Sequence, residues 1–283
     1  MKLALFNDYQ LGVVSEDRIY DVGAWVDWRA ERPQESLVRL MAAYDQVSSR
    51  LQGFAEAPSQ PLAQVRLRPP VPAPSKIVAA PVNYYRHQDE MNRQFNNAEH
   101  TIEKLGFFLK APSSIIGPGD AVQLPRADRR FDHEAELAFV VGRRARHVSA
   151  ADAHKYIFAY FALMDITMRG IEDRPMRKSF DTFTPIGPWL VTADEVENPH
   201  ELGLRLWVND DLRQDANTSD LIYDSYQFFA LASSVMTLEP GDILTTGTPE
   251  GVGPIHPGDT VRIEIERIGE FSVGVEAEQS QQR

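Results

Sequence analysis

Two glutamates stand at alternate positions in an otherwise apolar stretch, residues 131–142, which reads FDHEAELAFVVG. Side chains alternate between the faces of a strand, so Glu134 and Glu136 share one face with Ala138 and Val140. Neighbouring carboxylates repel each other, and burial beside apolar groups penalises their charge unless a positive partner is present. A bound cation would meet both demands. An exposed strand with two solvated glutamates is the other interpretation.

Asp165 is the third acidic candidate, since it ends an apolar segment 29 residues after Glu136. That separation fits a neighbouring strand reached through a short helix, so the three carboxylates could converge. The sequence contains no cysteine, which excludes disulfides and thiolate ligands and leaves oxygen or imidazole to hold a metal. Oxygen ligands suit Mg²⁺, Mn²⁺ or Ca²⁺, and three of them leave positions open for water and substrate.

His87 and Glu90 lie three residues apart in NYYRHQDEM, a segment expected to be helical. On a helix they share one face, where the carboxylate could orient the imidazole and raise its basicity. The pair is a candidate general base, and an ordinary surface ion pair is the alternative.

Two further segments could bind negative charge. Lys178 follows Arg174 and Arg177 in RPMRKSFDTFTPIGPW, which predicts a basic loop that either stabilises developing negative charge or is merely solvated. Residues 245–253, TTGTPEGVG, could offer backbone N–H groups to a carboxylate or could form a hairpin turn.

The elements that must position these side chains are mostly strands. Residues 1–67 contain short strand patterns and a helical pattern from Glu35 to Gln52, which predicts a small N-terminal domain. Residues 68–75 form a proline-rich connector, residues 76–275 a strand-rich catalytic domain, and residues 276–283 a frayed tail. Ser149 and Asp152, at capping-box spacing, predict a short helix before the strand that ends near Asp165.

Composition limits the possible partners. The net charge of −12, without a long basic tract, argues against nucleic acid. We find neither a run of about 18 apolar residues nor a signal-peptide pattern, so we expect no membrane association and a cytoplasmic location. An anionic substrate would need a local cationic pocket.

The ordered motifs resemble those of the fumarylacetoacetate hydrolase (FAH) family from about Lys76 to Val275. They are N-Y-x-x-H-x-x-E, F-F-L-K-x-x-S-S, the E-x-E strand, M-D-x-T-x-R, K-S-F-D-T-F-x-P-x-G-P, R-Q-x-x-x-T-S-D and G-D-I-L-x-T-G-T-P-x-G-V-G. The resemblance implies an α+β fold with the mixed β-sandwich roll of that family. It also implies a homodimer that uses Mg²⁺ or Mn²⁺, with Ca²⁺ possible.

The resemblance assigns roles to individual residues. It implies that the metal ligands are Glu134, Glu136 and Asp165, and that the catalytic residues are His87, Glu90 and Lys178. Thr248 falls in the loop that binds the substrate carboxylate in that family. Within the implied pocket the candidate substrate-binding residues are Lys110, Arg169, Arg213, Gln214 and Thr248, of which the three cations could instead be surface residues.

The implied reaction is hydrolytic cleavage of a C–C bond in a β-diketo acid, of the acylpyruvate or fumarylpyruvate type, through a metal-stabilised enolate. A decarboxylase or tautomerase of a 2-oxo diacid, such as oxaloacetate, is an alternative with the same metal site. The His87–Glu90 pair favours hydrolysis, because only hydrolysis needs an activated water. A catalytically inactive metal-binding interaction protein is the third possibility.

Overall fold

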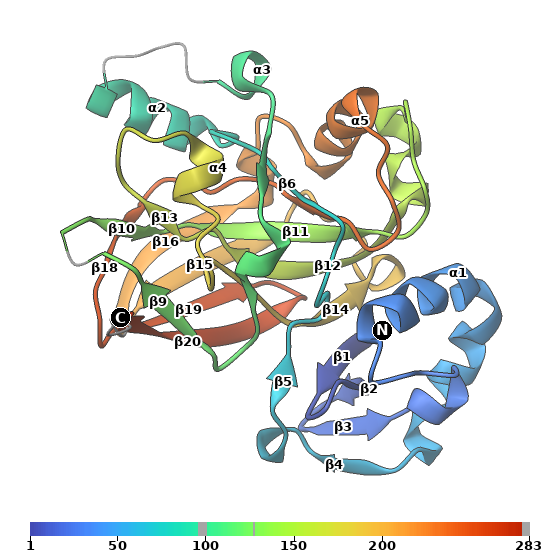
Figure 1. The fold of residues 1–283 in the computed structure, drawn as a ribbon. Coiled ribbons are helices and arrows are strands. Elements are labelled where there is room, and N and C mark those ends of the chain that lie inside the picture. Colours follow the sequence, from blue (N-terminus) through green and yellow to red (C-terminus); the bar gives the residue numbers. More distant parts are fainter. Residues whose placement is uncertain (96–100, 127, 279–283) are drawn as a thin grey trace.

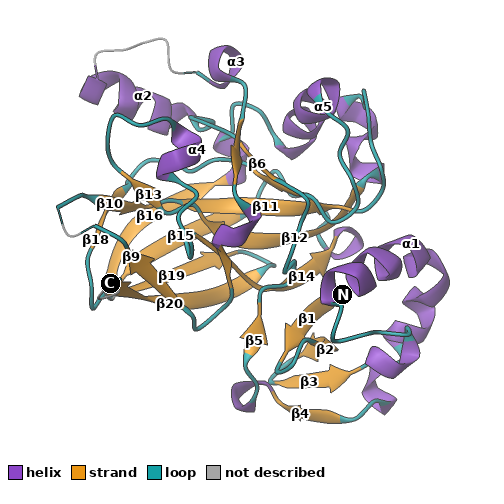
Figure 2. Ribbon diagram, viewed as in Figure 1, coloured by secondary structure: helices purple, strands orange, loops and turns teal. Residues whose placement is uncertain are grey.

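The computed structural model describes residues 1–95, 101–126 and 128–278, and for residues 93–95 only the backbone. Strands dominate it, and five α-helices of the described chain cover their faces and ends (Figures 1 and 2). The helices are α1 (Pro33–Gln52), α2 (Tyr85–Phe95), α3 (Ile102–Leu105), α4 (Arg174–Arg177) and α5 (Ser225–Val235). The predicted strand-rich α+β roll is confirmed. None of the helices in these ranges is long and apolar enough to span a bilayer.

The largest sheet runs through both halves of the chain. Its order is β4 (Ser59–Pro61), β3 (Arg18–Asp21), β2 (Gln10–Ser15), β1 (Lys2–Phe6), β14 (Thr184–Thr192), β12 (Ile157–Met164), β11 (Ala135–Val141), β17 (Ile243–Thr245), β6 (Ile77–Ala79) and β7 (Phe108–Lys110). Two short strands join it at the side, β5 (Leu67–Arg68) on β1 and β8 (Ile115–Ile116) on β14.

Two smaller sheets complete the roll. One has the order β13 (Thr167–Met168), β10 (Phe131–His133) and β18 (Gly253–Ile255). The other has the order β16 (Asp211–Asn217), β15 (Gly203–Val208), β19 (Thr260–Ile265), β20 (Gly269–Ala277) and β9 (Ala121–Leu124).

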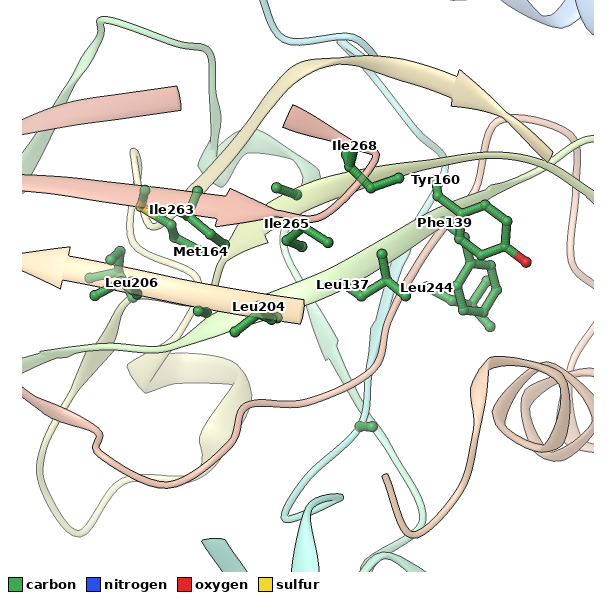
Figure 3. Close-up of a cluster of buried hydrophobic side chains, with 14 of the residues drawn as sticks. Leu137, Phe139, Tyr160, Met164, Leu204, Leu206, Leu244, Ile263, Ile265 and Ile268 are labelled. Carbon is green, nitrogen blue, oxygen red and sulfur yellow. The ribbon is translucent and has the colours of Figure 1, made fainter. Parts of the chain in front are cut away.

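The main core lies between the largest sheet and the five-stranded sheet. Figure 3 shows Leu137 of β11 in one buried cluster with Leu204 of β15 and Ile263 of β19, and Phe139 of β11 beside Tyr160 of β12. These odd-numbered side chains of β11 point into the sandwich, while Ala138 belongs to a second buried cluster on the opposite face. The two-residue alternation expected for this strand is therefore present, and it directs the neighbouring glutamates away from the sandwich core.

The N-terminal segment is not insulated from the rest of the chain. β1 pairs with β14, with Leu3 opposite Leu190, and the second buried cluster contains both residues. Helix α1 packs on this cluster through Leu37 and Leu40, three positions apart on one helical face. The segment of residues 1–67 thus extends the same sheet and shares a core with the catalytic part.

Several local predictions can be compared with the structure. Ser149 caps a short 3-10 helix, Ala150–Lys155, and β12 follows it as expected. Strand β20 continues to Ala277, two residues beyond the predicted end of the catalytic domain, and residues 279–283 of the predicted tail lie outside the described residues. The segment before Lys178, expected to be a loop, contains the helical turn α4. Figure 1 shows α4 and α2 together on the side of the roll that carries β10 and β13.

Candidate active site and metal centre

Three carboxylates converge at the junction of β10, β11 and β12. Glu134, Glu136 and Asp165 can each offer one oxygen such that all three oxygens lie within 4.8 Å of one another. The three residues are at most 6 % exposed. The alternative of an exposed strand with solvated glutamates is therefore wrong.

Strand pairing explains why residues so distant in sequence meet. β11 and β12 are antiparallel with Ala135 opposite Met164, and the N–H of Asp165 donates to the Glu134 carbonyl at 2.8 Å. Glu136 lies two residues further along on the same face. Its carboxylate accepts the Thr245 hydroxyl from the neighbouring strand β17 and the Gly247 N–H at 2.9 Å. The sheet register thus fixes all three acidic side chains on one face.

Glu134 stands where the chain passes from one sheet to another. β10 pairs with β13 and β18, whereas β11 pairs with β12 and β17. At this junction the N–H of Ala135 donates to the Gln214 side-chain oxygen at 2.9 Å. The side-chain nitrogen of Gln214 donates in turn to the Thr248 hydroxyl at 2.8 Å and to the Pro249 carbonyl at 3.0 Å. Gln214 therefore ties the carboxylate strand to the loop over the cavity.

Two buried lysines partly neutralise the carboxylates. Lys178 Nζ donates to Glu134 at 2.7 Å and to Asp165 at 2.5 Å. Lys110 Nζ pairs with the other oxygen of Asp165 and donates to the Phe183 carbonyl at 2.9 Å. Lys110 is therefore a partner of a metal-ligand candidate, and it is not among the residues that line the cavity.

The surroundings shift the pKa values of Glu134 and Glu136 in opposite directions. Burial alone would raise the pKa of Glu134, but Lys178 and Arg169 outweigh it and lower that pKa to about 2. Burial and the neighbouring Asp165 raise the pKa of Glu136 to about 8. A buried carboxylate next to a second carboxylate carries negative charge that the nearby cationic side chains do not fully balance. A bound metal cation would balance it.

The donor set fits a hard divalent cation. It consists of three carboxylates, buried and within reach of one another, with no thiolate or imidazole in the cluster. Mg²⁺ and Mn²⁺ prefer oxygen ligands of this kind. Glu134, Glu136 and Asp165 are thus the residues that would hold the ion.

A cavity of about 510 Å³ opens beside this cluster, a volume suited to a small ligand. Helix α2 contributes His87, 7 % exposed, and Glu90 to its lining. His87 Nδ1 lies 3.1 Å from a Glu90 carboxylate oxygen, and the hydrogen bond to His87 is the main reason that the pKa of Glu90 is lowered. Glu90 therefore engages Nδ1, and Nε2 is the ring nitrogen that makes no hydrogen bond within the described ranges.

The remaining predicted substrate-binding residues differ in whether they line the cavity. Thr248 lines the cavity, and Arg169 lines it while donating to Asp132 at 2.5 Å and to Glu134 at 3.3 Å. Gln214 is buried behind the cavity loop. Arg213 is exposed, pairs with Asp211 at 3.3 Å and does not line the cavity. Arg213 therefore lies outside the cavity wall, unlike Arg169 and Thr248.

Two buried polar residues of this site, Asp132 and Thr167, are not among the predicted site residues. Asp132 accepts hydrogen bonds from Arg130 at 2.7 Å and from Arg169, and the Thr167 hydroxyl donates to Glu134 at 3.0 Å. The alternation that identified Glu134, continued backwards by two residues, reaches Asp132. The same step forwards from Asp165 reaches Thr167.

Residues 76–276 match the family described as fumarylacetoacetate (FAA) hydrolase C-terminal. This chain therefore belongs to the fumarylacetoacetate hydrolase family, and with the carboxylate cluster this places it among metal-dependent hydrolases. The recognition made from the ordered motifs is confirmed.

Individual relatives extend the similarity to nearly the whole chain. A maleylpyruvate hydrolase of Aquipseudomonas alcaligenes is 45 % identical, covering 97 % of this chain and 99 % of that protein. The crystal structure of maleylpyruvate hydrolase from Sphingobium sp. SYK-6 in complex with manganese(II) and pyruvate superimposes with a TM-score of 0.89. It is 44 % identical and covers 99 % of this chain and 100 % of that one. A mitochondrial oxaloacetate tautomerase of Xenopus laevis is 37 % identical over 74 % of this chain and 67 % of that protein. Manganese in a close structural relative, together with the buried carboxylates, confirms the predicted divalent-cation site.

Proposed function

We propose that this protein hydrolyses the C–C bond of an acylpyruvate, a 2,4-dioxo acid, of which maleylpyruvate is the example named in two relatives. The observation that supports this proposal most directly is the pairing of His87 with Glu90 in a cavity that Glu134 and Lys178 also line. Hydrolysis needs a base for water in addition to a site that stabilises negative charge, and both are present in this one cavity.

The proposed ligands Glu134, Glu136 and Asp165 would hold a divalent cation. When bound, the cation supplies fixed positive charge to the oxygens of the 2-oxo acid end of the substrate. Lys178 remains beside the cluster, where its ammonium group can donate to an oxygen that becomes negative.

In the proposed reaction His87 accepts a proton from water at Nε2, while Glu90 holds the ring through Nδ1. The resulting hydroxide adds to the distal carbonyl carbon, and Lys178 stabilises the negative oxygen. The bond from that carbon to the methylene group then breaks, and its electron pair passes to the pyruvate fragment as an enolate. His87 returns the proton to the enolate carbon, which gives pyruvate and a carboxylic acid.

Replacing His87 by alanine tests this assignment. We expect His87→Ala to lower kcat for acylpyruvate cleavage by about 100-fold or more, measured from the loss of diketo-acid absorbance with Mn²⁺ present. His200→Ala is the matched control, because that histidine lies near Asp224 and bonds Ser225 outside the cavity lining. Equal activity of the two variants would remove His87 from the mechanism.

Tautomerisation or decarboxylation of a 2-oxo diacid is the second candidate, favoured by the oxaloacetate tautomerase among the relatives. Neither reaction needs an attacking water. Assaying oxaloacetate with His87→Ala separates the candidates, since an oxaloacetate activity that survives while acylpyruvate cleavage is lost assigns His87 to hydrolysis.

We also propose that the protein works as a cytoplasmic homodimer, as the resemblance to its family implies. The absence of cysteine means that folding requires no oxidising compartment. Light scattering after size-exclusion chromatography should give twice the chain mass of 31.9 kDa.

A further inference from the structure

Two arginines in the cavity wall have no carboxylate partner in the part of the chain that the structure describes. Arg174 and Arg177 both line the cavity, and both are half-buried. Within the described ranges, the Arg174 side chain makes no hydrogen bond or ion pair, and the Arg177 side chain makes one hydrogen bond, from Nε to the Glu172 carbonyl at 2.6 Å. By contrast, Arg130 and Arg169 in the same wall both bond the carboxylate of Asp132.

No acidic residue within the described ranges forms an ion pair with either of these two arginines. Both carboxylate oxygens of Glu172 accept from Arg129, at 3.1 and 2.8 Å, and Asp173 is exposed and forms no ion pair with either arginine. Burial lowers the pKa of Arg174, and the charge of Arg177 lowers it further. Burial and Arg169 act in the same direction on the pKa of Arg177. Two neighbouring guanidinium groups therefore line the cavity without an anionic partner among the described residues, although the whole chain carries a net charge of −12.

The helical turn α4 carries Arg174 and Arg177, which form no hydrogen bond or ion pair with the candidate metal ligands. The Lys178 N–H donates to the Arg174 carbonyl at 3.1 Å, so these residues are one helical turn apart, and both line the cavity. Lys178 reaches Glu134 and Asp165, whereas Arg174 does not touch them. A ligand that extends from the carboxylate cluster past Lys178 would therefore meet Arg174 at its other end.

We propose that Arg174, with Arg177 beside it, binds a second carboxylate at the distal end of the substrate, so that the enzyme selects diacids over acylpyruvates with an uncharged acyl group. This inference rests on the function proposed above for the orientation of the substrate, with its 2-oxo acid end at the carboxylate cluster. Guanidinium groups suit this task because their parallel N–H groups match a carboxylate.

Binding measurements test the selection without turnover. Calorimetric titration of the Mn²⁺-loaded protein would compare 2-oxoadipate with 2-oxohexanoate, which has the same chain length and a methyl group in place of the distal carboxylate. We expect the wild type to prefer the diacid by about ten- to a hundred-fold in Kd, the range for one charge-assisted pair. Arg174→Gln should abolish this preference, and Arg174→Lys should retain part of it.

A matched control is Arg143→Gln, which removes an exposed arginine paired with Asp45 and should leave the preference unchanged. The proposal is overturned if the wild type binds both acids equally or binds neither, or if Arg174→Gln weakens both by the same factor. Thermal unfolding of each variant verifies that it is folded.

Turnover of maleylpyruvate and acetylpyruvate separates this inference from the proposed function. If the wild type cleaves neither compound, the proposed hydrolysis fails, while a diacid preference in the titration still supports the role of Arg174. If both are cleaved and Arg174→Gln raises KM for both equally, hydrolysis stands and the distal carboxylate site fails.

Discussion

At the scale of single residues, the site is a balance of buried charge. Lys178 contacts Glu134 and Asp165, and all three side chains are almost fully enclosed. A buried ion pair adds little net stability, but removing one partner leaves an uncompensated charge whose dehydration is costly. The same lysine thus balances the buried carboxylates of the metal-free fold, and in the proposed reaction it also stabilises the negative oxygen.

Lys178→Gln makes this balance measurable. In the presence of a chelator we expect the free energy of unfolding to fall by about 3–5 kcal/mol, since two carboxylates lose their shared cation. Added Mn²⁺ replaces the missing charge, so the rise in Tm on adding MnCl₂ should be larger for the variant than for the wild type. Thermal unfolding with and without metal measures both quantities.

The matched control is Lys155→Gln. Lys155 also pairs with an aspartate, Asp152 at 2.6 Å, but the pair is exposed, so its loss should change stability by no more than about 1 kcal/mol. An equal Mn²⁺-induced rise in Tm for Lys178→Gln and the wild type would contradict the charge-balance account.

At the scale of elements, the site depends on the junction at which β10 and β11 join different sheets. Gln214 of β16 supports this junction, because it accepts from the Ala135 N–H and donates to the Pro249 carbonyl. Gln214→Leu keeps a similar volume but leaves both backbone groups buried without these partners. We expect a loss of about 2–4 kcal/mol in the free energy of unfolding and weaker Mn²⁺ binding, measured by urea unfolding and by metal titration.

Gln123→Leu provides the comparison, since the side chain of this strand glutamine donates to an exposed glutamate, Glu276, at 2.8 Å. Its stability should change by about 0.5 kcal/mol or less. If the two leucine variants lose equal stability, or if Gln214→Leu binds Mn²⁺ as tightly as the wild type, Gln214 does not hold the junction.

The sequence predicts features that follow from local alternation, but it does not predict contacts between residues that are distant along the chain. Alternation alone placed Glu134 and Glu136 on one face and could also have reached Asp132. It could not show that Gln214, rather than its neighbour Arg213, points inward, because strand faces alternate but no local signal tells which face of an edge hairpin is buried. The contact of Lys178 with Asp165 depends on tertiary packing around α4, a helical turn too short to have a clear sequence periodicity.

At the scale of the whole molecule, the boundary predicted near residue 67 does not divide the core. β1 continues the sheet of β14, and one buried cluster contains Leu3 and Leu40 from the N-terminal segment together with Leu163 and Leu190 from the rest. Segments that share a sheet and a core lose their stability together, because neither can unfold without exposing apolar surface of the other.

We therefore expect a single calorimetric unfolding transition for the metal-free chain, with a calorimetric enthalpy equal to the van't Hoff enthalpy per cooperative unit. Leu40→Ala, in α1, should shift that entire transition downwards, because truncating a buried leucine costs about 2–5 kcal/mol and Leu40 is only 2 % exposed. Leu212→Ala is the control, since Leu212 is 49 % exposed and its truncation should leave Tm nearly unchanged. Two resolved transitions, with only the smaller one shifted by Leu40→Ala, would show instead that residues 1–67 fold as an independent domain.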